Sequence, residues 1–212
     1  MKKVINLHQT DAKTIVDQLG KDLEVTVDKD GSDFCFELPK STGEGYLRGV
    51  NFSHGLSLLE GDFKPKKDIR FVFDNHKVNP LIMMFNVNEE ITLIESKKNK
   101  QIPIAKMKCC LFASGTSTYY TLEFKRKISN NLFALIIDRK ELEAKLDKIT
   151  SALSKEDKKL FKDLNGIYNF LNIDFFSLEI GQLIEEIRHC DIENLLKPMF
   201  IEGKVYEILS LQ

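Results

Sequence analysis

Residues 68–96 read DIRFVFDNHKVNPLIMMFNVNEEITLIES, and this stretch decides the predicted fold class. It holds three short runs of aromatic, β-branched and other apolar residues, separated by Asp, Asn, Pro and Glu. Short apolar runs between turn-forming residues are typical of β-strands. The same texture continues on both sides, so we expect about eight to ten strands between residues 23 and 138.

Upstream, LEVTV (23–27) and DFCFEL (33–38) flank residues 28–31, which predict a hairpin turn. In the second of these strands Phe34, Phe36 and Leu38 alternate with polar positions, so one face is buried. Residues 39–45 (PKSTGEG) are loop-like in composition. The other predicted strands are YLRGVNF (46–52), LSLLEGDF (56–63), DIRFVFDN (68–75), PLIMMFNV (80–87), EITLIES (90–96), IAKMKCCLF (104–112), YYTLEFKR (119–126) and NLFALIID (131–138).

Helical patterns lie at the two ends of the chain. A short helix is expected from Asp11 to Leu19, with Thr10 as its cap and Gly20 at its end. Four more are expected over 139–149, 154–164, 176–190 and from about Pro198 to the end. Strands followed by helices predict an α+β chain with an antiparallel sandwich or barrel. We therefore expect two parts, a β-barrel over 1–138 and a helical subdomain over 139–212.

Composition limits the possible functions. Thirty-one basic and 32 acidic residues give a formal net charge of −1, whereas nucleic-acid-binding domains generally show a basic excess. The sequence holds no signal-peptide pattern and no stretch apolar enough to span a membrane. The four cysteines follow no CxxC spacing, so we expect free thiols and a cytoplasmic location.

The end of the chain carries the clearest functional signal. Residues 184–198 (IEEIRHCDIENLLKP) and 199–212 (MFIEGKVYEILSLQ) resemble the close of the N-terminal sensor domain of AraC-type transcriptional regulators, in the subgroup that contains the pyochelin regulator. The positions that carry the resemblance are Glu202, Lys204, Glu207, Ile208 and Leu209. Ile208 stands where Leu is usual, and Gly203 is a second departure.

The resemblance implies a cupin-like barrel, a helical dimerisation unit and a small-molecule effector. DNA would be bound only through a helix-turn-helix domain that these 212 residues do not contain. The pattern still runs at Gln212, so we expect that the natural chain continues; a docked C-terminal helix is the alternative. A stand-alone cupin-like small-molecule-binding protein without a DNA role is the competing function.

Enzyme chemistry finds little support in the sequence. A metal-binding cupin needs a His-x-His pair with further ligands, and the four histidines (His8, His54, His76 and His189) lack that spacing. The hydroxyl-rich residues 114–118 have no nearby base with an orienting group. Cys109 or Cys110 would need a lowered pKa to act as a nucleophile. We expect no enzyme, no cofactor and no metal.

A ligand pocket and a partner surface are the remaining candidates. Aromatic, Met and Arg side chains on the predicted strands could line a pocket, although most aromatics of this kind are core. These ligand-binding candidates are Tyr46, Arg48, Arg70, Met83, Phe85, Tyr119 and Tyr120. The last two helices are apolar over more than half their circumference, which predicts a homodimer or a helix enclosed within the monomer. The candidates for the dimer interface are Ile184, Ile187, Met199, Gly203, Tyr206 and Leu209.

Overall fold

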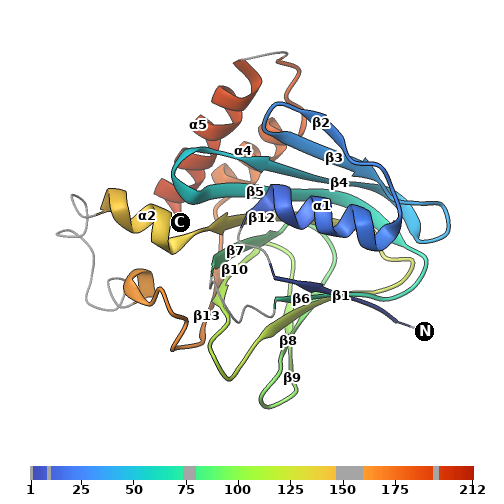
Figure 1. Cartoon of the computed structure of the whole chain (residues 1–212), viewed down its shortest axis with the longest axis horizontal. Coiled ribbons are helices and arrows are strands. Elements are labelled where there is room, and N and C mark those ends of the chain that lie inside the picture. Colours follow the sequence, from blue (N-terminus) through green and yellow to red (C-terminus); the bar gives the residue numbers. More distant parts are fainter. Residues whose placement is uncertain (1, 9–10, 74–79, 147–159, 193–195) are drawn as a thin grey trace.

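The computed structural model describes residues 2–8, 11–73, 80–146, 160–192 and 196–212. Two sheets face each other, and the C-terminal helices cover the outside of the larger one (Figure 1). This arrangement confirms the predicted α+β class and the order of a sandwich followed by helices. None of the described helices is long and apolar enough to cross a membrane.

The larger sheet has eight strands in the order β13-β10-β7-β12-β5-β4-β3-β2, all antiparallel. Their bounds are β2 Asp28–Asp30, β3 Asp33–Glu37, β4 Gly43–Asn51, β5 Leu56–Pro65, β7 Leu81–Asn86, β10 Lys108–Ala113, β12 Asn130–Ile137 and β13 Phe170–Phe175. A short 3₁₀ turn, η1 (Ser53–Gly55), joins β4 to β5.

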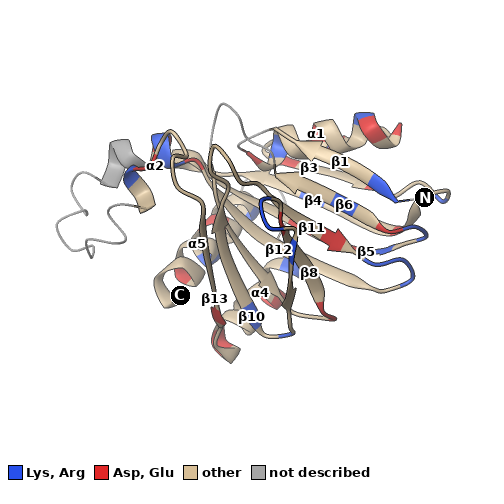
Figure 2. Ribbon diagram, turned by 90° about the horizontal axis from the view of Figure 1, so that it is seen from below, with Lys and Arg blue, Asp and Glu red and all other residues tan. Residues whose placement is uncertain are grey.

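The smaller sheet has five strands in the order β1-β6-β11-β8-β9. They are β1 Lys3–Leu7, β6 Ile69–Phe73, β11 Tyr120–Phe124, β8 Ile91–Glu95 and β9 Lys100–Ile104. Its pairs are antiparallel except β1 with β6, which run parallel. Charged residues lie mainly on the hairpin ends and helix surfaces, while the strand interiors are largely uncharged (Figure 2).

Strand alternation separates two apolar clusters. Along β12, Leu132, Ala134 and Ile136 face the space between the sheets, whereas Phe133 and Leu135 face the helices. The adjacent Cys109 and Cys110 point to opposite faces in the same way, as expected. The larger sheet is thus apolar on both sides, which explains why its central strands read as continuous apolar runs.

The helices differ from the sequence expectation at their ends. α1 (Ala12–Leu23) is capped by Asp11, whose side chain accepts a hydrogen bond from the Thr14 amide, and not by Thr10, which lies outside the described residues. The helix continues through Gly20 to Leu23, and its C-cap Glu24 adopts the left-handed conformation. The strand predicted over 23–27 is therefore wrong, and β2 begins only at Asp28.

The C-terminal region holds α2 (Arg139–Leu146), α4 (Leu178–Arg188) and α5 (Leu196–Leu211). Ser177 caps α4 as predicted, by accepting a hydrogen bond from the Ile180 amide. α5 begins at Leu196, two residues before the expected start. Most of the helix predicted over 154–164 lies outside the described residues. In its described part, residues 160–162 are helical. β1, β9 and β13 were not predicted.

Candidate functional site

The face of the larger sheet that α4 and α5 cover holds the features that bear on function. Apolar residues of both helices pack on it: Ile180, Leu183, Ile184, Ile187, Ile201, Val205 and Ile208 are all buried. Phe176, just before α4, meets Phe85 of β7 edge-to-face at 5.4 Å between ring centroids. The helical pair is therefore docked on the sheet through a second core.

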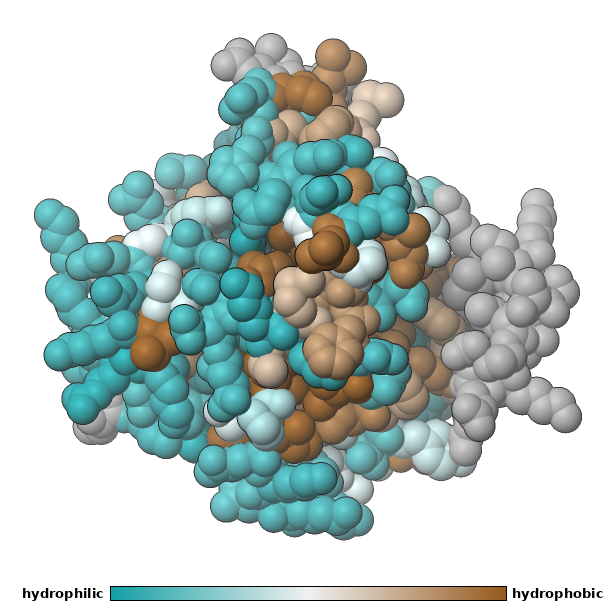
Figure 3. Space-filling view, turned by 180° about the vertical axis from the view of Figure 1, so that it is seen from behind, coloured by the Kyte–Doolittle hydropathy of each residue, from teal (hydrophilic) through white to brown (hydrophobic). Residues whose placement is uncertain are grey.

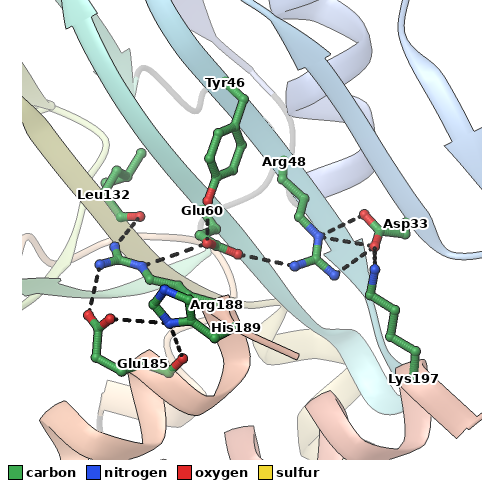
Figure 4. A network of polar contacts seen from close by, with 9 residues as sticks. All are labelled: Asp33, Tyr46, Arg48, Glu60, Leu132, Glu185, Arg188, His189 and Lys197. Carbon is green, nitrogen blue, oxygen red and sulfur yellow. Dashed lines mark hydrogen bonds and ion pairs between the residues drawn. The ribbon is translucent and has the colours of Figure 1, made fainter. Parts of the chain in front are cut away.

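A polar network crosses this contact at one end of the helical pair (Figure 4). Arg48 of β4 and Glu60 of β5 are opposite each other in the strand register, and both side chains point toward the helices. Arg48 binds Asp33 of β3 through Nε (2.9 Å to Oδ1) and Nη2 (2.6 Å to Oδ2), and reaches Glu60 through Nη1 at 3.3 Å. Two parallel bonds of this kind hold both groups in one plane.

Glu60 is the buried centre of this network, with only 1% of its side chain exposed. The Tyr46 hydroxyl donates to Glu60 Oε1 at 2.8 Å, and Arg188 at the end of α4 brings Nε to 3.7 Å from the same oxygen. On α5, Lys197 lies 3.7 Å from Asp33. A buried carboxylate requires such partners, and those of Glu60 come from the neighbouring strand β4 and from α4.

The network changes how its members ionise. Burial, the negative charge of Glu60 and the hydrogen bond to it raise the pKa of the Tyr46 hydroxyl, so it stays protonated. Burial lowers the pKa of the Arg48 guanidinium, but hydrogen bonding and charge from Asp33 and Glu60 outweigh this and raise it overall. The network thus holds the Tyr46 hydroxyl and the Arg48 guanidinium in their protonated forms.

The predicted ligand-binding residues lie in different places. Tyr46 and Arg48 belong to the network, and Arg70 donates to Glu123 at 2.5 Å on the smaller sheet. Met83 and Phe85 face the helices. The two tyrosines are also apart: Tyr120 is buried between the sheets, against Phe112, whereas Tyr119 is exposed. The structure does not bring these seven residues into one pocket.

The predicted dimer residues divide into two groups. Ile184 and Ile187 are fully buried against the sheet, so they offer no surface to a partner and that part of the prediction is wrong. Met199, Gly203 and Tyr206 are exposed on α5. Leu209 is half-buried beside the second core.

The exposed residues of α5 form a stripe. Leu196, Met199 and Tyr206 are 63%, 65% and 43% exposed, and a Cβ added at Gly203 would meet no atom within 4 Å. Their spacing of three, four and three residues keeps them on one side of a helix, opposite the buried Ile201. Hydrophobic side chains also gather in the middle of the rear face of the molecule (Figure 3).

The groups considered for catalysis are not activated. Burial and the charge of Asp174 raise the pKa of the Cys109 thiol to about 12, and burial also raises that of Cys110. A thiol nucleophile needs the opposite shift. Among the described residues no three His, Cys, Asp or Glu side chains are grouped to hold a metal. His76 lies outside those residues.

No model of a protein family matches the sequence, and no curated protein matches it significantly. Solved structures with a similar course of the chain include apo ToxT from Vibrio cholerae (TM-score 0.48, 14% identity, covering 76% of this chain and 55% of that one). The AraC-like transcriptional activator CuxR has a TM-score of 0.43 and 8% identity over 85% of this chain and 61% of its own. The bacterial pirin YhhW from Escherichia coli, in complex with nickel(II), has a TM-score of 0.35 and 8% identity over 72% and 55%.

The chain therefore spans between about half and three fifths of the length of these three proteins.

Proposed function

We propose that this chain is the effector-sensing and dimerisation part of an AraC-type DNA-binding transcriptional regulator, in the pyochelin-regulator-like subgroup. In this proposal the sandwich region (1–138) takes part in binding the effector, and the helical region (139–212) pairs two copies. A helix-turn-helix domain outside these residues binds DNA. The assignment to AraC-type regulators and to the subgroup rests on the resemblance of residues 184–212.

The observation that carries the dimerisation role is the exposed stripe of α5. Leu196, Met199, Gly203 and Tyr206 recur at the three-four spacing by which two helices pack side by side. Large apolar side chains exposed in a row on one face mark an interaction surface. A two-fold pair of α5 helices would cover the stripe with a second copy of itself.

Gly203 gives this proposal a sharp test. Its missing side chain leaves room for a second helix at the centre of the stripe, and the monomer itself offers a new side chain open space. Gly203→Trp should therefore leave the fold intact and push two helices apart. Gly181→Trp on α4 is the matched control, because a Cβ there meets only Phe176 at an ordinary 3.8 Å.

The measurement is the mass in solution by sedimentation equilibrium, with circular dichroism as the check of folding. We expect a dimer for the wild type and for Gly181→Trp, and a monomer for Gly203→Trp. A monomeric wild type, or a Gly203→Trp variant that still forms the dimer, would overturn the dimerisation role.

The DNA role needs a separate experiment. Reading the gene beyond the codon for Gln212 should reveal a basic segment with helix-turn-helix patterns, and the protein that includes it should bind DNA upstream of its target genes. A stop codon at that point would favour the stand-alone cupin-like small-molecule-binding protein. Effector binding is common to both functions, so it does not separate them.

A further inference from the structure

The space between the two sheets is filled by the protein's own side chains. Phe36, Phe63, Phe71, Phe112, Phe124 and Tyr120 are among its largest fully buried residues. Phe124 contacts Phe63 and Phe71 edge-to-face, each at 5.1 Å, and Phe112 contacts Phe73 at 5.4 Å. Interdigitated rings of this kind form a packed core. A ligand in the interior would have to displace them.

The outer face of the larger sheet offers more room. A hollow of about 390 Å³ lies on this face, over strands β7, β10, β12 and β13. The end of α5, Leu142 of α2 and residues 160–161 also line it. This volume is within the range of small-molecule sites. The residues that line this outer hollow are Leu81, Met83, Cys109, Leu111, Ile137, Leu142, Leu160, Phe161, Asn172, Asp174, Leu209 and Gln212.

Strand register explains the chemistry of the outer hollow. Cys109 and Leu111 of β10 are paired with Asp174 and Asn172 of β13, so these four side chains share one face of the sheet. Within the part of the chain that the structure describes, Asp174 is the only charged residue that lines the hollow. The apolar floor therefore has one polar edge, along β13, which carries a carboxylate and an amide.

We propose that the outer hollow binds a small, largely apolar molecule that carries a cationic or hydrogen-bond-donating group. The apolar body lies over Met83 and Leu111, and the donating group meets Asp174 and Asn172. An anionic molecule is disfavoured, because Asp174 repels it and no Lys or Arg is among the described residues that line the hollow. The site is thus outside the sandwich, between the sheet and the helices.

The outer hollow also touches the helix that we propose to form the dimer. Leu209 of α5 and Gln212, directly after the helix, line it, one to two turns beyond Tyr206 of the exposed stripe. A ligand there contacts sheet and helix at once, so it stabilises the docked position of α5 by differential affinity. That the ligand is the effector of a regulator rests on the proposed function; the site itself does not.

The test uses three probes of equal chain length that differ only in the head group: decylamine, decanol and decanoate. Binding to the folded chain is measured by displacement of the neutral dye Nile red and by isothermal titration calorimetry. Leu111→Trp fills the hollow, and Leu178→Trp, at an exposed position on α4, is the matched control. Asp174→Asn removes the charge but keeps the oxygen that accepts the hydrogen bond of the Phe175 amide.

We expect decylamine and decanol to bind the wild type at least tenfold more tightly than decanoate. Leu111→Trp should lose this binding, Leu178→Trp should keep it, and Asp174→Asn should reduce the preference of the protein for the amine over decanoate at least tenfold. Circular dichroism verifies that each variant is folded. If Leu111→Trp does not fold, the Asp174→Asn result decides alone.

Three results would overturn the proposal: no binding of the amine and the alcohol to the wild type, wild-type binding by a folded Leu111→Trp, or an unchanged head-group preference in Asp174→Asn. Adding decylamine during sedimentation tests the link to the regulator separately. Binding without any effect on dimerisation supports the site and contradicts its role as an effector site that acts through α5.

Discussion

Replacing Glu60 by Gln removes the charge at the centre of the network while keeping its shape. Gln can still accept the hydrogen bond from Tyr46, which is 2.8 Å long in the wild type. The contacts that lose their charge are those to Arg48 at 3.3 Å and to Arg188 at 3.7 Å. Arg48 retains its two-point pairing with the Asp33 carboxylate, whereas Arg188 loses the charge of Glu60 and keeps only the single ion pair with Glu185. The positive charge of Arg188 is therefore the one that is neutralised less well.

The size of the effect follows from burial. Removing one partner of a buried ion pair typically costs about 3–5 kcal/mol, because the other charge remains buried. The Arg188 side chain is only 9% exposed, but Glu185 still reaches it at 3.3 Å. We therefore expect the lower end, about 3 kcal/mol of unfolding free energy. For a chain of this size that lowers the melting temperature by roughly 6–12 °C.

Urea unfolding at neutral pH, followed by circular dichroism, measures this change. Glu185→Gln is the matched control: the same substitution on a half-exposed carboxylate of the same arginine should cost less than about 1 kcal/mol. If Glu60→Gln costs no more than the control, the network does not hold the helices on the sheet. Equal m-values for the variants are needed for this comparison.

Three further predictions follow. Burial raises the pKa of Glu123, but hydrogen bonds from its basic partners outweigh burial and lower the folded-state pKa from 4.5 to about 2. The stabilisation by the Glu123 carboxylate is therefore complete above pH 4.5 and is lost as the pH falls toward 2. Acid titration of Glu123→Gln should show a shallower loss of stability in that pH window. Cys109 and Cys110, buried with raised pKa values, should resist a thiol reagent at neutral pH until urea unfolds the protein, and rapid modification of either would contradict their burial. Gly49→Ala places a Cβ 2.7 Å from the Ala12 carbonyl oxygen, so it should cost about 1–3 kcal/mol by urea unfolding, and a neutral result would mean that α1 moves freely on β4.

The fold class was predictable because local patterns and burial agree. Phe34 and Phe36 alternate with polar residues, and both are buried as that alternation requires. β9 and β13 were missed since KQIPI contains Lys and Pro, and FLNIDF lies among helical patterns. The end of α1 was misplaced because Gly20 is needed for contact with Val27, where a Cβ would come within 2.6 Å, and not for ending the helix.

The site was less predictable, because its partners meet only through strand register and helix docking. Arg48 has the chemistry of an anion-binding residue, but Asp33 and Glu60 already neutralise it, and neither is near it in sequence. The same limit applies to α5. Its pattern indicates two apolar faces, and only docking on the sheet shows that the face with Gly203 stays exposed.

The parallel pairing of β1 with β6 has a consequence for how the chain folds. Lys3 is paired with Ile69, so β1 has no strand to pair with in the described sheet until β6 has been made. β13 is likewise paired with β10, across the whole of α2. Contacts between such distant parts of a chain form slowly, since a long loop must close first. The hairpin of β4 and β5 needs no such delay, and we expect assembly of the protein to start there, with the first strand joining late.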